Sequence, residues 1–308
     1  MAGDRLRVIC GPTAAGKSAV ALELCEMHNA AILSADSRQI YRRFDIGTAK
    51  PTPEQRTRVT HYGIDVADPQ ERYSAARWAS EANDWIQCAD NAGKDAVIVG
   101  GTGLYIKALV DPLFSAPEMD SVQRSQLERE LETKPLDELR RWCEELDPAR
   151  AHLGRTQLLR AIETALLSGA RISDLHAEHK AVTAVEVQDE SVAYLVVDPG
   201  SELESRIPAR VDWMLKAGWA DEVRELIRMV PPDAPAWKAS GYSVIREHVE
   251  GRLDLSSARE RIIIETRQYA KRQRTWFRHQ LPPTAVTVVN PEDSQARAVA
   301  REWWERAE

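Results

Sequence analysis

Apolar residues gather in five short runs along the chain, and most of these runs are separated by longer stretches of mixed polarity. The runs cover residues 6–10, 31–35, 96–99, 192–197 and 285–289. Short apolar runs joined by helix-length segments are typical of a mostly parallel sheet with helices on its faces. We therefore predict an α/β fold, with a weaker extra strand at residues 63–66.

Helical periodicity fills the intervals between these runs. Apolar residues recur at helical spacing in residues 18–27 and 73–87, and Ser74 is suited to cap the second helix. Further helices are expected at residues 202–229, 242–250 and 256–280, with a short terminal helix around Trp303 and Trp304.

A charged, strand-free segment divides this pattern. We predict a smaller, all-helical insertion domain at residues 117–184, between the two parts of a catalytic core at residues 1–116 and 185–308. The insertion carries an apolar stripe that we interpret as its own core, formed by Leu127, Leu131, Leu136, Leu139, Trp142 and Leu146.

The composition favours a cytoplasmic protein with no membrane segment. Of the 308 residues 43% are hydrophobic, no run reaches 18 apolar residues, and the first residues show no signal-peptide profile. A monomer is the simplest expectation. The cysteines Cys10, Cys25, Cys88 and Cys143 lack short pairings, so we interpret them as small core residues rather than as zinc ligands or disulfides.

Positive charge is concentrated near the C-terminus of a chain whose net charge is −7. Residues 259–279 hold seven Lys or Arg against two Glu, and four of these basic residues fall on one helical stripe: Arg267, Lys271, Arg274 and Arg278. Aromatic residues lie between them: Tyr269, Trp276 and Phe277. Such a stripe suits a phosphate backbone with unpaired bases. A solvated helix face with its aromatics in the core is the alternative.

The first apolar run leads into Gly-Pro-Thr-Ala-Ala-Gly-Lys-Ser at residues 11–18, a phosphate-binding loop in its expected place before a helix. Its backbone N–H groups and the helix dipole attract an anion, Lys17 adds a mobile charge, and the Ser18 hydroxyl is a ligand for Mg²⁺. The loop alone does not distinguish a nucleotide from another diphosphate.

Two more polar segments follow strand ends, where open α/β sheets bind ligands. Asp36 after the second run is a candidate general base or metal partner, or else a helix cap. Thr102 lies in the glycine turn 100–103, which offers a hydroxyl and an amide or is only a tight turn. Lys50, in the polar loop 45–51, either meets a phosphate or is a solvated surface residue.

Taken in order, these motifs resemble the bacterial tRNA dimethylallyltransferases. The resemblance runs from about residue 8 to residue 280 and is carried by residues 11–18, 36–42, 45–51, 100–105, 240–242 and 266–278. It implies a fold like that of phosphate-loop NTPases. It also implies transfer of a dimethylallyl group from dimethylallyl diphosphate to N6 of the adenine on the 3′ side of the anticodon in tRNA, with Mg²⁺ as cofactor.

The resemblance also implies roles for individual residues. Asp36 removes a proton from the adenine amine, Thr102 lies beside the reacting groups, and Lys17 assists the reaction. The diphosphate is bound by Gly11, Pro12, Thr13, Ala14, Ala15, Gly16, Lys17, Ser18 and Arg210, with the metal on Ser18. The tRNA is contacted by Asp36, Ser37, Arg38, Gln39, Thr102, Arg124, Gln157, Arg160, Gly241, Tyr242, Lys271, Arg272, Gln273, Arg274, Trp276 and Arg278.

One segment departs from the family pattern. Residues 153–157 read Leu-Gly-Arg-Thr-Gln where the family usually has Asn-Asp and then Arg, and we hypothesise that Arg155 substitutes in tRNA recognition. Three other functions share part of the motif set: prenylation of free adenine nucleotides, phosphorylation of a small metabolite, and RNA binding without catalysis. The basic helix and the insertion disfavour the first, the basic stripe at residues 266–278 disfavours the second, and Asp36 beside an intact phosphate loop disfavours the third.

Overall fold

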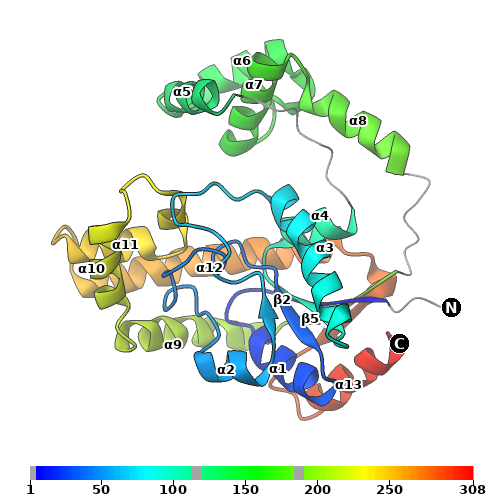
Figure 1. The fold of residues 1–308 in the computed structure, drawn as a ribbon. Coiled ribbons are helices and arrows are strands. Elements are labelled where there is room, and N and C mark those ends of the chain that lie inside the picture. The colour runs from blue at the N-terminus through cyan, green and yellow to red at the C-terminus, as the bar shows by residue number, and fades with distance from the viewer. Residues whose placement is uncertain (1–4, 112–119, 184–190, 308) are drawn as a thin grey trace. The chain divides into compact units, whose positions relative to one another are not determined.

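The computed structural model of the protein describes residues 5–111, 120–183 and 191–307. Its centre is a six-stranded parallel sheet in the order β3-β2-β4-β1-β5-β6 (Figure 1). The strands are β1 Leu6–Cys10, β2 Ala31–Ser34, β3 His61–Tyr62, β4 Ala96–Gly100, β5 Val192–Val197 and β6 Val286–Val289. The predicted α/β class and the five main strands are confirmed.

The sixth strand was placed too late in the sequence. The structure puts β3 at His61–Tyr62 and not at residues 63–66. Gly63 and Asp65 both have positive φ angles, 75° and 59°, so the backbone turns where an extended strand was expected.

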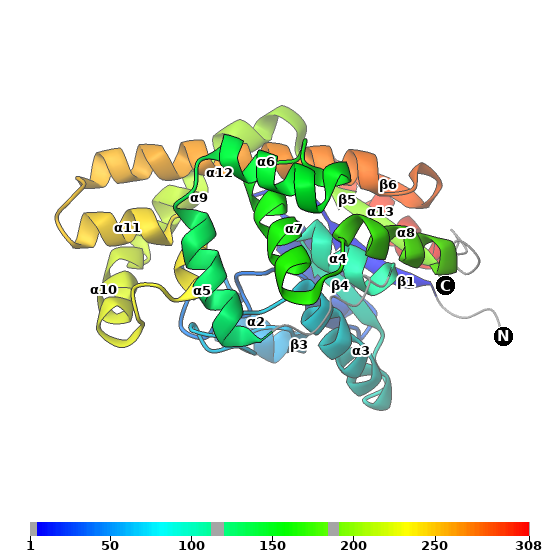
Figure 2. The same cartoon turned by 90° about the horizontal axis from the view of Figure 1, so that it is seen from above.

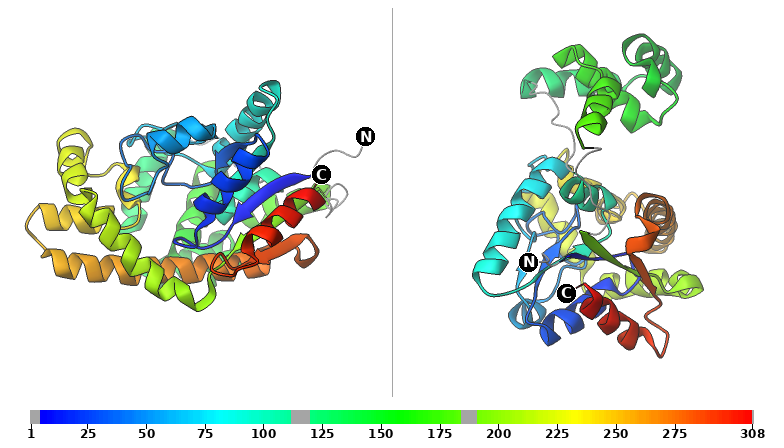
Figure 3. Two further views of the ribbon diagram at one scale, coloured as in Figure 1. Left: turned by 90° about the horizontal axis from the view of Figure 1, so that it is seen from below. Right: turned by 90° about the vertical axis from the view of Figure 1, so that its right-hand side faces the viewer.

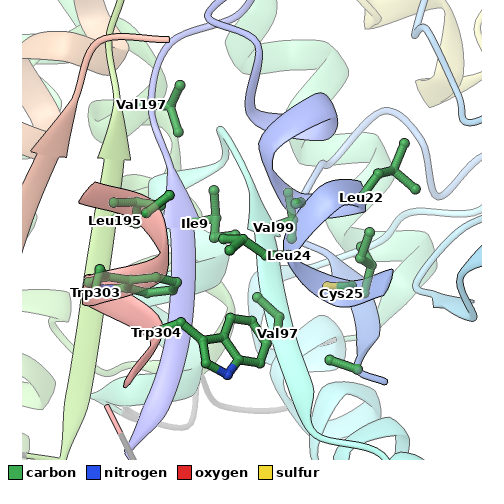
Figure 4. Packing of buried hydrophobic residues seen from close by; sticks show 14 of the residues in the cluster. Ile9, Leu22, Leu24, Cys25, Val97, Val99, Leu195, Val197, Trp303 and Trp304 are labelled. Atoms are coloured by element: carbon green, nitrogen blue, oxygen red, sulfur yellow. The ribbon is translucent and has the colours of Figure 1, made fainter. Parts of the chain in front are cut away.

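Helices cover both faces of the sheet (Figure 3). On one face α1 Lys17–Met27 packs beside α13 Ala296–Arg306, and on the other α3 Ala75–Asn91 packs with α4 Gly103–Val110. Apolar side chains from α1, α13 and alternate strand positions form one core, in which Trp303 and Trp304 fill the space beside β1 (Figure 4). The predicted cap of α3 is present, because the Ser74 hydroxyl accepts a hydrogen bond from the Arg77 amide, 3.1 Å away.

The helices after β5 extend this first compact unit. They are α9 Leu203–Lys216, α10 Trp219–Met229, α11 Tyr242–Val249 and the 26-residue α12 Leu255–Gln280. The helix predicted at 202–229 is two helices, because Gly218 has a φ of 96° and ends the first. Short elements complete the set: α2 Pro53–Arg58, η2 Gly200–Glu202, η3 Pro235–Lys238 and η4 Pro283–Ala285.

A second compact unit comprises Asp111–Val187, and Met1–Val110 with Gln188–Glu308 make up the first. It contains α5 Ser121–Glu132, α6 Leu136–Leu146, η1 Pro148–Arg150, α7 Arg155–Ser168 and α8 Ile172–Thr183 (Figure 2). All six residues of the predicted apolar stripe belong to its core or pack against it. Both predicted domain boundaries, at 116/117 and 184/185, lie outside the described residues.

The interpretation of the cysteines is correct for three of them. Cys10, Cys25 and Cys143 are buried, whereas Cys88 is exposed on α3. Within residues 5–111, 120–183 and 191–307, no helix combines the length and apolar character needed to span a bilayer.

Candidate active site

The phosphate-binding loop leaves the carboxyl end of β1 and enters α1. Ala14 and Gly16 have positive φ angles of 62° and 96°, which curl the backbone into a concave turn. The Lys17 ammonium donates a hydrogen bond to the Pro12 carbonyl, 2.7 Å away, so its side chain folds back over the loop. Gly11 has no room for a side chain, because a Cβ there would lie 2.2 Å from the Val197 carbonyl oxygen of the neighbouring strand.

A cavity of about 420 Å³ opens beside this loop, at the carboxyl edge of the sheet. It brings together ten of the residues predicted to contact the diphosphate or the tRNA. Those that line it are Thr13, Ala14, Lys17, Ser18, Asp36, Arg38, Gln39, Arg210, Arg272 and Gln273. An apolar wall from α9, α10 and α12 completes the cavity and includes Val211, Met214, Trp219 and Ile262.

Two cations and one carboxylate dominate the electrostatics of the cavity. Burial and, to a smaller extent, repulsion from the Arg210 guanidinium lower the pKa of Lys17 to about 8, while the Asp36 carboxylate opposes the shift. Burial also lowers the pKa of Arg210, again opposed by Asp36. A diphosphate placed beside Lys17 and Arg210 would offset this charge repulsion.

Asp36 begins the turn after β2 and does not cap a helix. One of its carboxylate oxygens, Oδ1, accepts a hydrogen bond from the Arg38 amide, 2.8 Å away. Thr102 joins this turn to the second glycine loop: its Oγ1 accepts a hydrogen bond from the Ser37 amide at 3.0 Å, and its own amide donates to the Ala35 carbonyl at 3.1 Å. Thr102 therefore fixes the backbone that carries Asp36.

Tyr269 of α12 also faces this region. Burial raises the pKa of its phenol to about 12, and the nearby charge of Asp36 contributes, while a hydrogen bond with Thr102 acts in the opposite direction. In the sequence Tyr269 stood out only as an aromatic residue between basic ones. The structure adds that it lines the same cavity as Asp36.

The sequence-based predictions missed one arginine that supports the phosphate loop. The Arg206 guanidinium donates hydrogen bonds to the carbonyls of Ala14 and Ala15, at 3.4 and 3.0 Å, and pairs with Glu292. Arg206 lies one helical turn before Arg210 on α9, so the two residues share a face of that helix. This spacing was the only signal in the sequence.

Three predicted contact residues have internal roles. Tyr242 is fully buried, and its hydroxyl donates to Glu222 at 2.6 Å and accepts from the Gly47 amide at 3.1 Å. Gly241 adopts a φ of 81° at the start of α11, and a Cβ there would lie 2.3 Å from the ring of Trp219. The tRNA contact predicted for Tyr242 and Gly241 is therefore replaced by a structural role for both.

Gln273 is the third of these residues. Its side-chain amide forms hydrogen bonds with the phosphate loop and with the second glycine loop, and the residue is only 6% exposed.

Lys50 is neither a phosphate ligand nor a solvated residue. Its ammonium lies 2.6 Å from Asp45 and 2.5 Å from Asp65, and it donates to the Tyr41 carbonyl at 2.6 Å. The side chain is 3% exposed. Both interpretations of Lys50 from the sequence are wrong, and the residue instead holds the 45–51 loop to the turn that contains Asp65.

Some basic residues of helix α12 are exposed at the surface, and another forms an ion pair within the fold. Lys271, Arg272 and Arg278 are exposed, as is Arg267. Two of them, Lys271 and Arg272, line a surface groove of about 570 Å³ together with the half-buried Trp276. Arg274 differs, because its guanidinium pairs with Asp198 after β5, with an Nε–Oδ2 distance of 2.9 Å. The predicted four-residue stripe therefore presents three free-standing cations and one that anchors the helix.

In the second unit, the predicted tRNA contacts are Arg124, Gln157 and Arg160. Arg124 pairs with the buried Glu163 at 2.9 Å, whereas Gln157 and Arg160 are exposed. The Arg155 guanidinium donates to backbone carbonyls at the end of α5, including that of Lys134 at 2.8 Å. The hypothesis that Arg155 substitutes in tRNA recognition is therefore not supported, because its donors are used within the fold.

Comparison with known proteins decides the family. The family model described as IPP transferase matches residues 39–280. The chain belongs to the IPP transferase family. The resemblance inferred from the motifs is thereby confirmed. The matched range includes residues 39–42, Asp45–Lys50 and the second glycine loop, whereas Asp36 and the phosphate loop precede it.

Relatives in this family are similar over nearly their whole length. A tRNA dimethylallyltransferase of Cyanothece sp. is 38% identical over 300 residues, covering 94% of this chain and 93% of the relative. One of Thermotoga maritima is 41% identical over 281 residues, covering 89% of both. Among solved structures, a tRNA isopentenylpyrophosphate transferase of Bacillus halodurans superimposes with a TM-score of 0.68 at 29% identity, covering 99% and 96% of the two chains.

A second solved structure supports the fold alone. A eukaryotic dimethylallyltransferase acting on tRNA gives a TM-score of 0.78 at 23% identity, over 97% of this chain and 78% of its own.

Proposed function

We propose that this member of the IPP transferase family transfers a dimethylallyl group from dimethylallyl diphosphate to N6 of the adenine 3′ to the anticodon in tRNA. The observation that carries the proposal is the single cavity in which the phosphate loop, Lys17 and Arg210 face the Asp36 carboxylate. Relatives that cover nearly the whole chain are named tRNA dimethylallyltransferase.

The diphosphate binds at the cationic end of the cavity. Lys17 and Arg210 neutralise the charge that grows on the diphosphate as the bond between the allylic carbon and oxygen breaks. The electron pair of that bond leaves with the diphosphate oxygen. The apolar wall of Val211, Met214 and Ile262 excludes water and so protects the positively charged allylic carbon from hydrolysis.

The acceptor binds at the carboxylate. The exocyclic amine of adenine is a weak nucleophile, so its lone pair forms the new carbon–nitrogen bond only as Asp36 accepts one of its protons. Thr102 holds the Ser37 amide and thereby the orientation of this turn. An adenine inside a stacked loop has to be extruded to reach the cavity.

The oxygen atoms beside the phosphate loop suit Mg²⁺ in the way that is usual for sites where the ion binds together with phosphates. Within the described part of the chain, no group of three His, Cys, Asp or Glu side chains could hold a metal ion by itself. Mg²⁺ typically binds one or two protein oxygens together with substrate phosphates, and the exposed Ser18 hydroxyl at the cavity supplies such an oxygen. When bound, the ion would neutralise the diphosphate.

The basic surface of α12 is the proposed tRNA contact in the first unit. Lys271, Arg272 and Arg278 give exposed charges for phosphates, and Trp276 borders the same groove. In the second unit we propose contacts through Arg124, Gln157 and Arg160. We further propose that the enzyme acts in the cytoplasm as a monomer.

A labelling assay tests the proposal. The protein is incubated with Mg²⁺ and radiolabelled dimethylallyl diphosphate, together with unmodified tRNA, AMP, or ATP plus candidate metabolites. We expect label in tRNA only, on the adenine 3′ to the anticodon after nuclease mapping. Label on AMP would instead indicate a nucleotide prenyltransferase, and phosphate transfer from ATP would indicate a kinase.

A further inference from the structure

One buried side chain spans the gap between the phosphate loop and the second glycine loop. Gln273 of α12 accepts a hydrogen bond from the Thr13 amide through Oε1, at 2.8 Å, and donates one to the Gly101 carbonyl through Nε2, also at 2.8 Å. The residue is 6% exposed. Each end of its amide is therefore satisfied by a different loop of the cavity.

The second glycine loop is shaped to receive this helix. A Cβ at Gly101 would lie 2.3 Å from Gln273 Nε2, and a Cβ at Gly103 would lie 2.4 Å from the ring of Trp276. Both contacts are shorter than any side chain tolerates, so the glycines allow α12 to lie directly on the loop. The position of α12 thus sets the position of residues 101–103.

The next residue attaches α12 to a third strand. Arg274 pairs with Asp198 at the end of β5 and donates to the Gly200 carbonyl, at 2.5 Å. Residues 273 and 274 therefore connect one turn of α12 to the ends of β1, β4 and β5. The same turn exposes Lys271 and Arg272, two of the proposed tRNA contacts.

We propose that Gln273 is a positioning residue that fixes the diphosphate loop relative to the loop of Thr102, and through it the Asp36 turn. The inference rests on the proposed function for the reaction that the two loops serve. By holding the Thr13 N–H, Gln273 sets the curvature of the phosphate loop. By holding the Gly101 carbonyl, it places Thr102, whose hydroxyl binds the Ser37 amide beside Asp36. Loss of both hydrogen bonds changes the separation between the leaving diphosphate and the proton acceptor.

The first test removes both hydrogen bonds while keeping the length of the side chain. We expect Gln273→Met to lower kcat by about tenfold or more and to weaken binding of inorganic diphosphate with Mg²⁺ several-fold, because each hydrogen bond is worth up to about tenfold. The affinity for tRNA should stay within about twofold, since the side chain is buried. Gln87→Met, on the exposed surface of α3, is the matched control and should leave all three quantities unchanged.

The second test uses protonation to restore the contact. In Gln273→Glu, the protonated carboxyl accepts from Thr13 and donates to the Gly101 carbonyl as the amide does, whereas the ionised form faces that carbonyl with a negative charge. Burial raises the pKa of a carboxyl. The ratio of this variant's kcat to that of the wild type should therefore rise several-fold from about pH 8 to about pH 6, while the ratio for Gln273→Met stays flat.

These measurements separate positioning from other roles. A kcat for Gln273→Met within about twofold of the wild type, or a pH-independent ratio for Gln273→Glu, would overturn the inference. A loss of tRNA affinity that parallels the loss of kcat would also overturn the inference, because it would indicate that Gln273 contacts tRNA. If the methionine variant does not fold, the glutamate variant decides alone. If the wild type transfers no prenyl group, the proposed function fails, and diphosphate affinity, measured with the same variants and pH values, still decides the role of Gln273.

Discussion

The depressed pKa of Lys17 predicts that diphosphate binding weakens as the pH rises above about 8. Burial and the Arg210 guanidinium lower the pKa of this ammonium from 10.5 to about 8. A bound diphosphate favours the protonated form, so at pH values above the pKa of the free enzyme, binding has to take up a proton. Between about pH 7 and about pH 9, the protonated fraction falls from about nine-tenths to about one-tenth, which predicts an affinity loss of about tenfold.

The assay is calorimetric titration of dimethylallyl diphosphate with Mg²⁺ in the absence of tRNA, so that no transfer occurs. The arginine in Lys17→Arg stays charged throughout this range. Dividing the wild-type affinity by that of the variant therefore cancels the effect of the ligand's own ionisation on binding. An ordinary lysine with a pKa of 10.5 would keep its charge to pH 9. A ratio that stays constant across the range would therefore refute the account of the cavity as a site where two half-buried cations repel each other.

Three further outcomes follow from the contacts. Asp36→Asn should lower single-turnover transfer by about 100-fold or more while tRNA binding in a filter assay changes little, and a parallel loss of binding would show a structural role instead. Replacing Lys271 and Arg278 by Ala should weaken tRNA binding and reduce its dependence on salt, whereas Arg274→Ala should mainly lower the melting temperature, because this residue pairs inside the fold. Tyr242→Phe should cost about 1–3 kcal/mol in urea denaturation, since Oε1 of the half-buried Glu222 carboxylate loses its donor and the Gly47 amide loses its acceptor, and it should leave tRNA affinity unaltered; a normal stability with reduced affinity would contradict the buried placement of Tyr242.

The sequence was sufficient for the features that local pattern controls. The strands of a doubly covered parallel sheet are continuous apolar runs, so β1, β2, β4, β5 and β6 were located to within one residue at their starts and ends. The phosphate loop was equally clear, because its chemistry depends on eight consecutive residues. The break at Gly218 was available as a helix stop signal but was hidden by the strong periodicity on either side of it.

What the sequence did not reveal depends on partners that are distant along the chain. Lys50 looked like a surface residue or a phosphate ligand, because nothing local shows that Asp45 and Asp65 enclose it. Tyr242 was predicted to contact tRNA, because nothing local shows that its hydroxyl is bound by Glu222 and the Gly47 amide. Arg206 and Gln273 reach the phosphate loop across about 190 and 260 residues, a separation that periodicity cannot detect.

The same long separations bear on how the protein is made. The phosphate loop precedes Arg206 and Gln273, which brace it, by about 190 and 260 residues, so both are added long after the loop has been synthesised. β1 likewise waits for β5 before it has a neighbour on each side. A chain under synthesis therefore carries its anion-binding sequence well before the residues that brace it, and the loop gains its full set of contacts only once α12 has been made.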